Sequence, residues 1–318
     1  MQPNTLSHPF SERQERLRAL LEVRKLPLLV VSNPLNIFYL TGFRGSAGVA
    51  VFSEAGAVLW VDPRYTLQAY DQAQGVDVLE EKGVLLKAAG RWLGRKRFKL
   101  AGYDDGYLTC AVYRQLREWA PRNLRLKPAG GLVEELRCVK DASEIECIRQ
   151  AGSLTASVFE DLRQQIRPGV RESDLAAEVE YRMRRGGADG AAFETIVASG
   201  PRAAWPHARA SSKLLKKSEL VIFDLGAILR GYAADMTRTI SLGAPSQRVR
   251  SLYNAVLEAH RWALEAALAG ETTGNVDAAA RRVLRHRWLE KFFTHSTGHG
   301  EKGYRRKEGK RVPSPAEC

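Results

Sequence analysis

Cysteines are few in this chain, and long apolar runs are missing. The four cysteines form neither a C-x-x-C pair nor a dense framework: Cys110, Cys138, Cys147 and Cys318. This usage argues against a disulfide scaffold, so we expect reduced thiols. No window approaches the roughly 18 to 20 apolar residues of a membrane span, and the opening "MQPNTLSHPFSERQERLRALL" lacks the apolar stretch of a secretory signal. We therefore expect a cytoplasmic protein without a membrane partner.

The positive net charge is large but spread along the chain. The formal charge is +13, yet lysines and arginines are interleaved with acids in helix-like stretches such as "RRVLRHRWLEK". Interleaving of this kind is typical of solvated helix faces, whereas a nucleic-acid surface gathers its basic residues to neutralise phosphates. We expect no nucleic-acid partner.

Length and pattern indicate two domains of α/β (α+β) class. A chain of 318 residues with 44% hydrophobic content is long enough for about two cores. A helix-like segment over residues 11–24 precedes three strand-like runs, "LPLLVVS", "AGVAVF" and "AVLWVD", of which the last two are joined by the turn-like "SEAG". Strand-like and helix-like pieces then alternate, which favours an α/β layer fold.

The boundary between the domains falls near Gly130 and Gly131. Asp141 or Ser143 then caps a helix whose apolar residues recur at spacings of three and four. Neither an internal repeat nor a low-complexity linker is visible. The predicted domains cover residues 9–136 and 144–300, and a basic tail over residues 301–318 is expected to be disordered.

The stretch "SELVIFDLGAILRGYAADMTRTISLG" contains two strand-like runs that meet near Leu229 and Arg230. A hairpin centred between those two residues would place Asp224 directly opposite Asp235 and direct both carboxylates to a largely apolar side. Like charges facing each other at about 5 Å on such a side are destabilising, so we expect a shared proton or a bound cation. An ordinary turn, or an ion pair with Arg230 or Arg238, is the alternative.

Histidines favour the cation. His295 and His299 lie four residues apart in "HSTGHG", where the glycines make a helix unfavourable and an extended strand would keep both rings on one side. Carboxylate with imidazole suits manganese, cobalt, iron or zinc better than calcium. His207 in "WPHARA" follows the apolar strand "FETIVASG", and such a histidine taken alone is more often structural.

The segments "NIFYLTGFRGS" and "VDPRY" together resemble the amino-terminal domain of the creatinase, prolidase and aminopeptidase P group. The matching residues of the first segment are Asn36, Tyr39, Leu40, Thr41, Gly42, Phe43, Gly45 and Ser46. The resemblance implies a creatinase-like domain that covers the active site and helps in substrate selection and oligomerisation. In "VDPRY", Asp62, Arg64 and Tyr65 are expected to form a turn with a capping aspartate, with a ligand contact at the strand end as the alternative.

The order "FETIVASGPRAAWPHA", "FDLGAILRGYAADMTRT", "HSTGHG" is similar to the catalytic domain of the pita-bread metallopeptidases. The resemblance implies a pita-bread domain that releases the N-terminal residue of peptides with proline in second position. It also implies two divalent metal ions (Mn, Co or Zn), held in the family by two aspartates, one histidine and two glutamates. Asp224, Asp235 and His299 fall on the first three of these positions, and His207 and His295 fall on two catalytic histidines that contact the substrate. A homodimer follows from the same resemblance.

The segment after Gly300 departs from that family pattern. Family members continue with an apolar stretch, another histidine and two glutamate-bearing strands, whereas the acids remaining here are Glu301, Glu308 and Glu317 in a basic setting. We therefore expect a catalytic domain that is incomplete at its C-terminus, by truncation or frameshift, with at most a partial metal site and uncertain activity. Two other functions stay open: a non-catalytic relative that binds a peptide or a partner, and creatinase-like hydrolysis of a small amidine.

Overall fold

The computed structural model describes residues 9–298 and divides into two compact units, with the division between Val139 and Lys140. Across 9–298, no helix is long and apolar enough to cross a bilayer.

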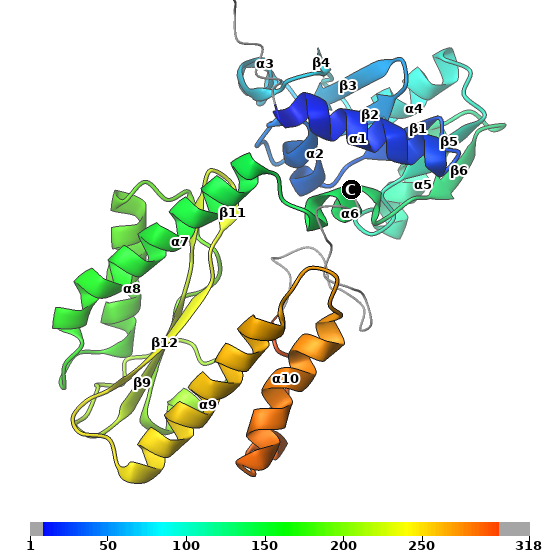
Figure 1. Ribbon diagram of the computed structural model, residues 1–318. Coiled ribbons are helices and arrows are strands. Elements are labelled where there is room, and N and C mark those ends of the chain that lie inside the picture. Colours follow the sequence, from blue (N-terminus) through cyan, green and yellow to red (C-terminus); the bar gives the residue numbers. More distant parts are fainter. Residues whose placement is uncertain (1–8, 299–318) are drawn as a thin grey trace, which may run out of the picture. The chain divides into compact units, whose positions relative to one another are not determined.

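A six-stranded mixed sheet forms the centre of the first unit (Figure 1). Its order is β4-β3-β2-β1-β5-β6, in which β1, β2 and β3 are antiparallel neighbours while β4, β5 and β6 join in parallel. The strands are β1 (Leu28–Val31), β2 (Val49–Ser53), β3 (Gly56–Val61), β4 (Asp77–Glu80), β5 (Leu100–Tyr103) and β6 (Arg125–Pro128). The three apolar runs expected as strands are β1, β2 and β3, with "SEAG" as the turn between the last two, so these predictions are confirmed.

Helices cover both faces of this sheet because its central strands are apolar on both sides (Figure 1). In β1, Leu29 and Val31 belong to a core shared with α1, α2, α3 and α6, whereas Leu28 and Val30 belong to a core shared with α4 and α5. Successive side chains of a strand point to opposite faces, so one continuous apolar run fills two cores. The helices are α1 (Pro9–Val23), α2 (Pro34–Thr41), α3 (Thr66–Gln72), α4 (Leu85–Arg95), α5 (Cys110–Trp119) and α6 (Leu132–Cys138).

The "VDPRY" segment is a capped turn after β3. Asp62 accepts a hydrogen bond from the backbone N–H of Arg64 at 2.9 Å and binds the guanidinium Nε and Nη2 of the same residue at 3.0 and 2.8 Å. The Arg64 side chain thereby lowers the pKa of Asp62. The hydroxyl of Tyr65 lies 2.6 Å from Ser46 Oγ and links the turn to the "GFRGS" segment. The predicted turn with a capping aspartate is confirmed.

A buried carboxylate links the end of β5 to the start of α2. Asp104 is 4% exposed and accepts hydrogen bonds from the backbone N–H groups of Ser32 and Asn33 at 2.6 and 2.7 Å, and from the Ser32 hydroxyl at 2.9 Å. Burial raises the pKa of Asp104 to about 6, because the lost hydration outweighs these hydrogen bonds. The carboxyl group therefore titrates within the range of ordinary buffers.

We expect this group to make the first unit less stable as the pH rises. The pKa of Asp104 is about 6 in the folded chain and 3.8 for an ordinary aspartate, so the folded state holds the extra proton between these values and ionisation opposes folding. Between about pH 4.5 and about pH 7.5, the wild type should lose about 2 kcal/mol of unfolding free energy relative to Asp104→Asn. Urea-unfolding midpoints of both proteins at the two pH values test this. Equal pH slopes, or a wild-type advantage that grows with pH, contradict it.

The second unit begins with a long helix and builds two small antiparallel sheets. Its elements are α7 (Ala142–Leu162), η1 (Arg163–Gln165), α8 (Glu172–Arg185), β7 (Gly190–Ala191), β8 (Ile196–Ser199), η2 (Gly200–Ala204), β9 (Leu220–Leu225), β10 (Ala227–Leu229), β11 (Tyr232–Ala233), β12 (Met236–Ser241), α9 (Gln247–Ala266), α10 (Thr273–His286) and η3 (Glu290–Phe292). Asp141, one of the two residues predicted to cap this helix, is the cap of α7. Its carboxylate accepts a hydrogen bond from the Glu144 N–H at 2.9 Å, and the Glu144 carboxylate accepts one from the Asp141 N–H at 3.0 Å. This reciprocal capping box defines where the helix begins.

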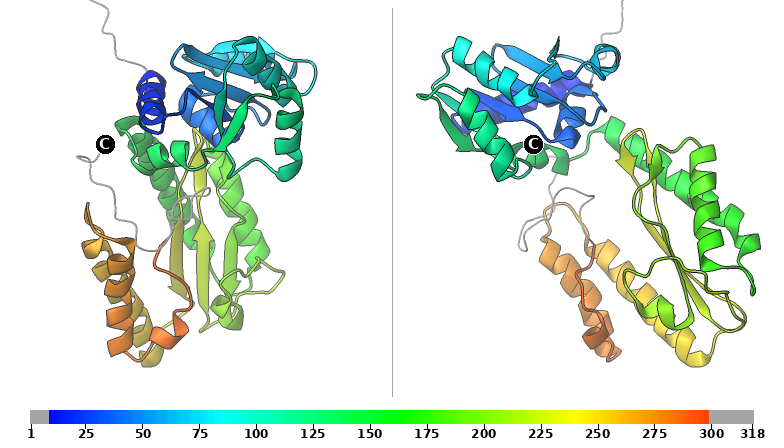
Figure 2. Two further views of the ribbon diagram at one scale, coloured as in Figure 1. Left: turned by 90° about the vertical axis from the view of Figure 1, so that its right-hand side faces the viewer. Right: turned by 180° about the vertical axis from the view of Figure 1, so that it is seen from behind.

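The sheets are ordered β12-β9-β8 and β11-β10-β7, and α7 and α8 cover one face of them (Figure 2). Phe223 and Leu225 of β9 pack in one core with Phe159 of α7 and Val179 of α8. Helices α9 and α10 lie side by side as a pair with a small core of their own, centred on alanines (Figure 1). The catalytic candidates lie in the strands and loops of this unit and on the segment after α10.

Candidate metal and catalytic site

The hairpin that carries both aspartates turns at Arg230 and Gly231. Leu229 pairs with Tyr232, and the two residues between them have φ of +51° and +83°. Two successive positive φ angles are typical of a type I′ turn, whose twist matches that of paired strands, and glycine favours its second position. The centre of the hairpin therefore lies one residue further along the chain than the strand-like runs suggested.

This shift of the turn changes the partner of Asp224. In the β9–β12 ladder Asp224 lies opposite Thr237, whose hydroxyl donates a hydrogen bond to Asp224 Oδ1 at 2.8 Å. The predicted direct pairing of Asp224 with Asp235 is wrong. Gly231 indicates the correct turn in the sequence. A hairpin centred between Leu229 and Arg230 would require a positive φ at Leu229, which is unfavourable for leucine.

Asp235 sits where the ladder is interrupted. Leu225 pairs with Met236, and the N–H of Ala234 donates to the Ala227 carbonyl at 2.9 Å, so Gly226 and Asp235 lie between these two points. At Gly226 a Cβ atom would be 1.8 Å from the carbonyl oxygen of Ala234. On a regular ladder the residue two positions before Thr237 is a diagonal neighbour of Asp224, roughly 7–8 Å away on the same face. By register, Asp235 therefore holds a position diagonal to Asp224, and glycine is required at position 226 for the close approach of the two segments.

The carboxylates do not point into the core. Val221, Phe223 and Leu225 of β9 are buried against α7 and α8, so the alternation directs Asp224 to the opposite face, where it is half-buried, and Asp235 is exposed. The alternation keeps Asp224 on the predicted face with Leu220 and Ile222, but this is the face that α7 and α8 leave uncovered. Because neither carboxylate is fully buried, their negative charges do not require a bound cation for compensation. The metal hypothesis therefore depends on the chemistry of the donor atoms.

His207 lies on the loop between η2 and β9 and is exposed. Its neighbour Trp205 is 58% exposed, with the Arg202 guanidinium 5.1 Å from its ring centroid. The imidazole of His207 is therefore accessible to a ligand.

His295 lies on an irregular segment that follows η3. Its ring packs edge-on against Phe293 with centroids 4.7 Å apart, and Nδ1 lies 3.0 Å from the Ser296 carbonyl oxygen. The expected strand is wrong for this part of the segment, since residues 293–298 are irregular and Gly298 has a φ of +73°. His299 and the tail over residues 301–318 lie outside the described residues.

The Asp277–Arg281 ion pair on α10 forms hydrogen bonds with the backbone of the segment that carries His295. Arg281 donates to the carbonyl oxygens of Phe293 and His295 at 3.1 and 2.7 Å and pairs with Asp277 at 2.7 Å. Asp277 also accepts from the Thr297 N–H at 2.7 Å. Burial alone would raise the pKa of Asp277, but the hydrogen bonds from Arg281 and Thr297 outweigh it and lower the pKa. This pair was not found from the sequence, because it looks like an ordinary i, i+4 surface pair.

The described residues fit a metal site only in part. Asp224 and Asp235 offer hard oxygen donors on one hairpin, which together with an imidazole suit Mn, Co or Zn. Among residues 9–298, however, no three His, Cys, Asp or Glu side chains lie together in a way that could hold an ion. Two of the three proposed ligands are thus placed on the same hairpin, and the third, His299, falls beyond this range.

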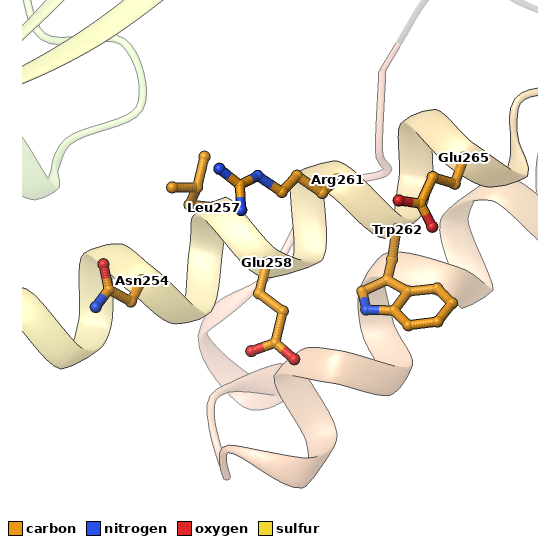
Figure 3. A pocket seen from close by; sticks show the side chains of 6 residues that line it. All are labelled: Asn254, Leu257, Glu258, Arg261, Trp262 and Glu265. Atoms are coloured by element: carbon orange, nitrogen blue, oxygen red, sulfur yellow. The ribbon is translucent and has the colours of Figure 1, made fainter.

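A hollow of about 340 Å³ on α9 is unrelated to these residues. Among the described residues, its lining comes from one helix (Figure 3): Asn254, Leu257, Glu258, Arg261, Trp262 and Glu265. Figure 3 shows Glu258 directed toward the α10 side, where Arg287 pairs with it at 2.9 Å. Asp224, Asp235, His207 and His295 are not among these lining residues, so the hollow is separate from the described catalytic candidates.

Comparison with known proteins identifies both units. The profile of the creatinase/prolidase N-terminal domain matches residues 13–139, and that of metallopeptidase family M24 matches residues 146–310, beyond Gly300. The Xaa-Pro dipeptidase of Pyrococcus furiosus is 31% identical over 292 residues, which are 92% of this chain and 82% of that protein.

Two solved structures share the fold over most of the chain. An Xaa-Pro dipeptidase from Bacillus anthracis superposes with a TM-score of 0.88 at 34% identity, covering 96% of this chain and 85% of that one. An X-Pro aminopeptidase from Thermotoga maritima gives a TM-score of 0.84 at 33% identity, covering 94% and 84%. The predicted architecture, a creatinase-like α/β domain followed by a pita-bread domain, is confirmed. The chain belongs to metallopeptidase family M24 and carries a creatinase/prolidase-type N-terminal domain.

Proposed function

We propose that this chain hydrolyses the bond between the N-terminal residue and a proline in second position of a peptide, as an Xaa-Pro aminopeptidase or dipeptidase. The observation that carries the proposal is the Asp224–Asp235 hairpin inside the unit that matches family M24. Relatives named Xaa-Pro dipeptidase and X-Pro aminopeptidase, each covered over more than four-fifths of its length, support the substrate class.

Asp224, Asp235 and His299 are the proposed ligands of divalent metal ions such as Mn, Co or Zn. When bound, such ions acidify a water molecule and polarise the scissile carbonyl group. The hydroxyl of Thr237, 2.8 Å from Asp224 Oδ1, orients that carboxylate. An orienting hydrogen bond of this kind reduces the rearrangement needed when a ligand binds.

His207 and His295 are the proposed catalytic histidines. Each is an exposed imidazole on a non-regular segment, so each can approach a bound peptide. An imidazole N–H directed at the scissile carbonyl oxygen stabilises the charge that develops there, and one directed at the prolyl nitrogen supports its departure.

Metal-dependent cleavage of a synthetic Xaa-Pro dipeptide and an Xaa-Pro-Xaa tripeptide tests the proposal. Protein treated with a chelator should be inactive. Added manganese, cobalt or zinc should restore cleavage of both proline peptides, or of the dipeptide alone. The Ala-Ala control peptides should stay uncleaved. Well-folded protein that binds these peptides without cleaving them at any metal concentration would instead be a non-catalytic binder. That alternative is favoured by the partial ligand set within residues 9–298. A cytoplasmic location and a homodimer stay predictions from the sequence.

A further inference from the structure

A fully buried carboxylate stands at the start of α8, outside the hairpin that carries the two aspartates. The Glu172 side chain has no exposed surface, and its two oxygens accept five hydrogen bonds. Oε1 accepts from the N–H and the hydroxyl of Ser199, both at 2.8 Å. Oε2 accepts from Arg202 Nε at 3.1 Å and from the N–H and hydroxyl of Ser211 at 3.2 and 2.7 Å. A buried carboxylate is tolerated only with such complete pairing.

These donors come from both ends of one loop. We name residues 200–212 the His207 loop; Ser199 and Arg202 stand at its beginning, and Ser211 stands at its end. Arg202 also donates to the carbonyl oxygen of Arg209, across the loop. Glu172 and Arg202 thus tie together the two ends of the segment that carries His207.

A second charged pair reinforces the same junction. Lys213 Nζ donates to Ser199 Oγ at 2.7 Å and pairs with Glu219 Oε2 at 2.6 Å. The backbone N–H groups of Glu172 and Ser173, in the first turn of α8, bond the carbonyl oxygens of Lys213 and Ser211 at 3.1 and 2.9 Å. The junction is therefore held by polar contacts throughout.

Apolar packing holds the loop at two small side chains, the buried Ala208 and the partly buried Ala210. Of the side chains in residues 200–212, Ala208 is the one that is buried, at 2% exposure, while Trp205, Pro206 and His207 are exposed. The conformation of such a loop depends on its hydrogen bonds rather than on its hydrophobic contacts. Because Glu172 accepts five of them, its removal should free the loop while the core of the unit stays intact.

We propose that Glu172 is a positioning residue for catalysis, which acts through His207 by holding both ends of the His207 loop. The inference rests on the proposed function, since it assumes that His207 contacts the substrate. The charge of Glu172 is essential to this role: every donor around it is an N–H or O–H group, so an amide in its place would direct its own N–H groups at donors.

Glu172→Gln should therefore lower kcat for the Xaa-Pro peptide by about 10- to 100-fold, with a smaller effect on KM. The matched control is Glu178→Gln on the same helix, which loses a partly exposed ion pair with Arg182 and should retain wild-type rates. Ser211→Ala removes one donor and should act in the same direction by less; it serves as the second variant if the glutamine protein fails to fold.

Two readouts separate positioning from a merely structural role. In a double-mutant cycle, Glu172→Gln should have almost no further effect on kcat in a His207→Ala background, because both changes act through one group. In hydrogen-exchange measurements without substrate, residues 200–212 should exchange faster in Glu172→Gln than in the wild type, and not in Glu178→Gln.

The proposal is overturned if hydrogen exchange of residues 200–212 is the same in Glu172→Gln as in the wild type. It is also overturned if Glu172→Gln lowers kcat by the same factor in the His207→Ala background as in the wild type. A wild-type protein that never cleaves Xaa-Pro peptides refutes the proposed function and with it the catalytic role of Glu172. The exchange measurement then still decides whether Glu172 holds the loop.

Discussion

Asp224→Asn and Asp235→Asn should each reduce metal-dependent Xaa-Pro cleavage by about 10³-fold or more, because a metal ligand supplies several kcal/mol of transition-state stabilisation. Asparagine keeps the size of the side chain and one oxygen acceptor but removes the negative charge that a divalent ion requires. Activity over a manganese titration, together with calorimetric metal binding, measures the effect. We expect both the affinity for metal and the rate at saturation to fall.

The same two variants should not be unstable without metal. Asp224 and Asp235 lie on one hairpin, and asparagine keeps an oxygen that accepts hydrogen bonds such as that from Thr237, so the melting temperature of the metal-free protein should stay close to that of the wild type. Asp161→Asn, an exposed aspartate on α7, is the control and should change neither activity nor stability. Wild-type metal affinity and activity in both hairpin variants would remove these residues from the proposed site.

Gly226→Ala should unfold or deform the hairpin, at a cost of about 1–3 kcal/mol or more. Its Cβ would meet the carbonyl oxygen and carbon of Ala234 at 1.8 and 2.8 Å and Phe193 Cε1 at 3.1 Å. The first two are backbone atoms, so the strand itself has to move, and Asp235 follows Ala234 directly. Activity should be lost along with stability.

Gly152→Ala is the matched control for that substitution. Gly152 lies inside α7, where an added Cβ meets no atom within 4 Å. Alanine there should stabilise the helix by about 0.5–1 kcal/mol. Thermal and urea unfolding of the three proteins give the comparison. Equal midpoints for wild type and Gly226→Ala would show that the hairpin tolerates the extra methyl group.

Local patterns were sufficient for three central strands of the first unit. The runs "LPLLVVS", "AGVAVF" and "AVLWVD" became β1, β2 and β3, because four or more consecutive apolar residues next to turn-forming ones satisfy strand and core requirements at once. The cap at Asp141 was predictable for a similar reason, since its hydrogen bonds span only three residues.

The predicted hairpin register was wrong, because the register depends on the position of one turn. Gly231 allows the left-handed backbone that a two-residue turn needs, and this moved Thr237 opposite Asp224. The face of β9 was also beyond local reasoning. Both sides of β9 are similarly apolar, with Leu220 and Ile222 on one and Val221 and Phe223 on the other. The packing of α7 and α8 decides which side is covered.

The buried Glu172 shows most clearly what distant contacts add. In the sequence it is an acid in the first turn of a helix, a place where acids are common because of the helix dipole. Its partners Ser199 and Ser211 lie 27 and 39 residues away, so no local spacing predicts them.

Local sequence was enough for the three central strands of the first unit, the start of α7, the order of the motifs and, through those motifs, the family. Such features depend on apolar patterns and on hydrogen bonds between residues a few positions apart. These interactions are local, so the sequence of the segment alone is enough to predict them. Three features needed the packed structure: Thr237 rather than Asp235 lies opposite Asp224, α7 and α8 leave the Asp224 face uncovered, and Glu172 binds Ser199 and Ser211 at both ends of the His207 loop. These features arise where segments far apart in the chain meet, and there the packing of whole elements outweighs local preference.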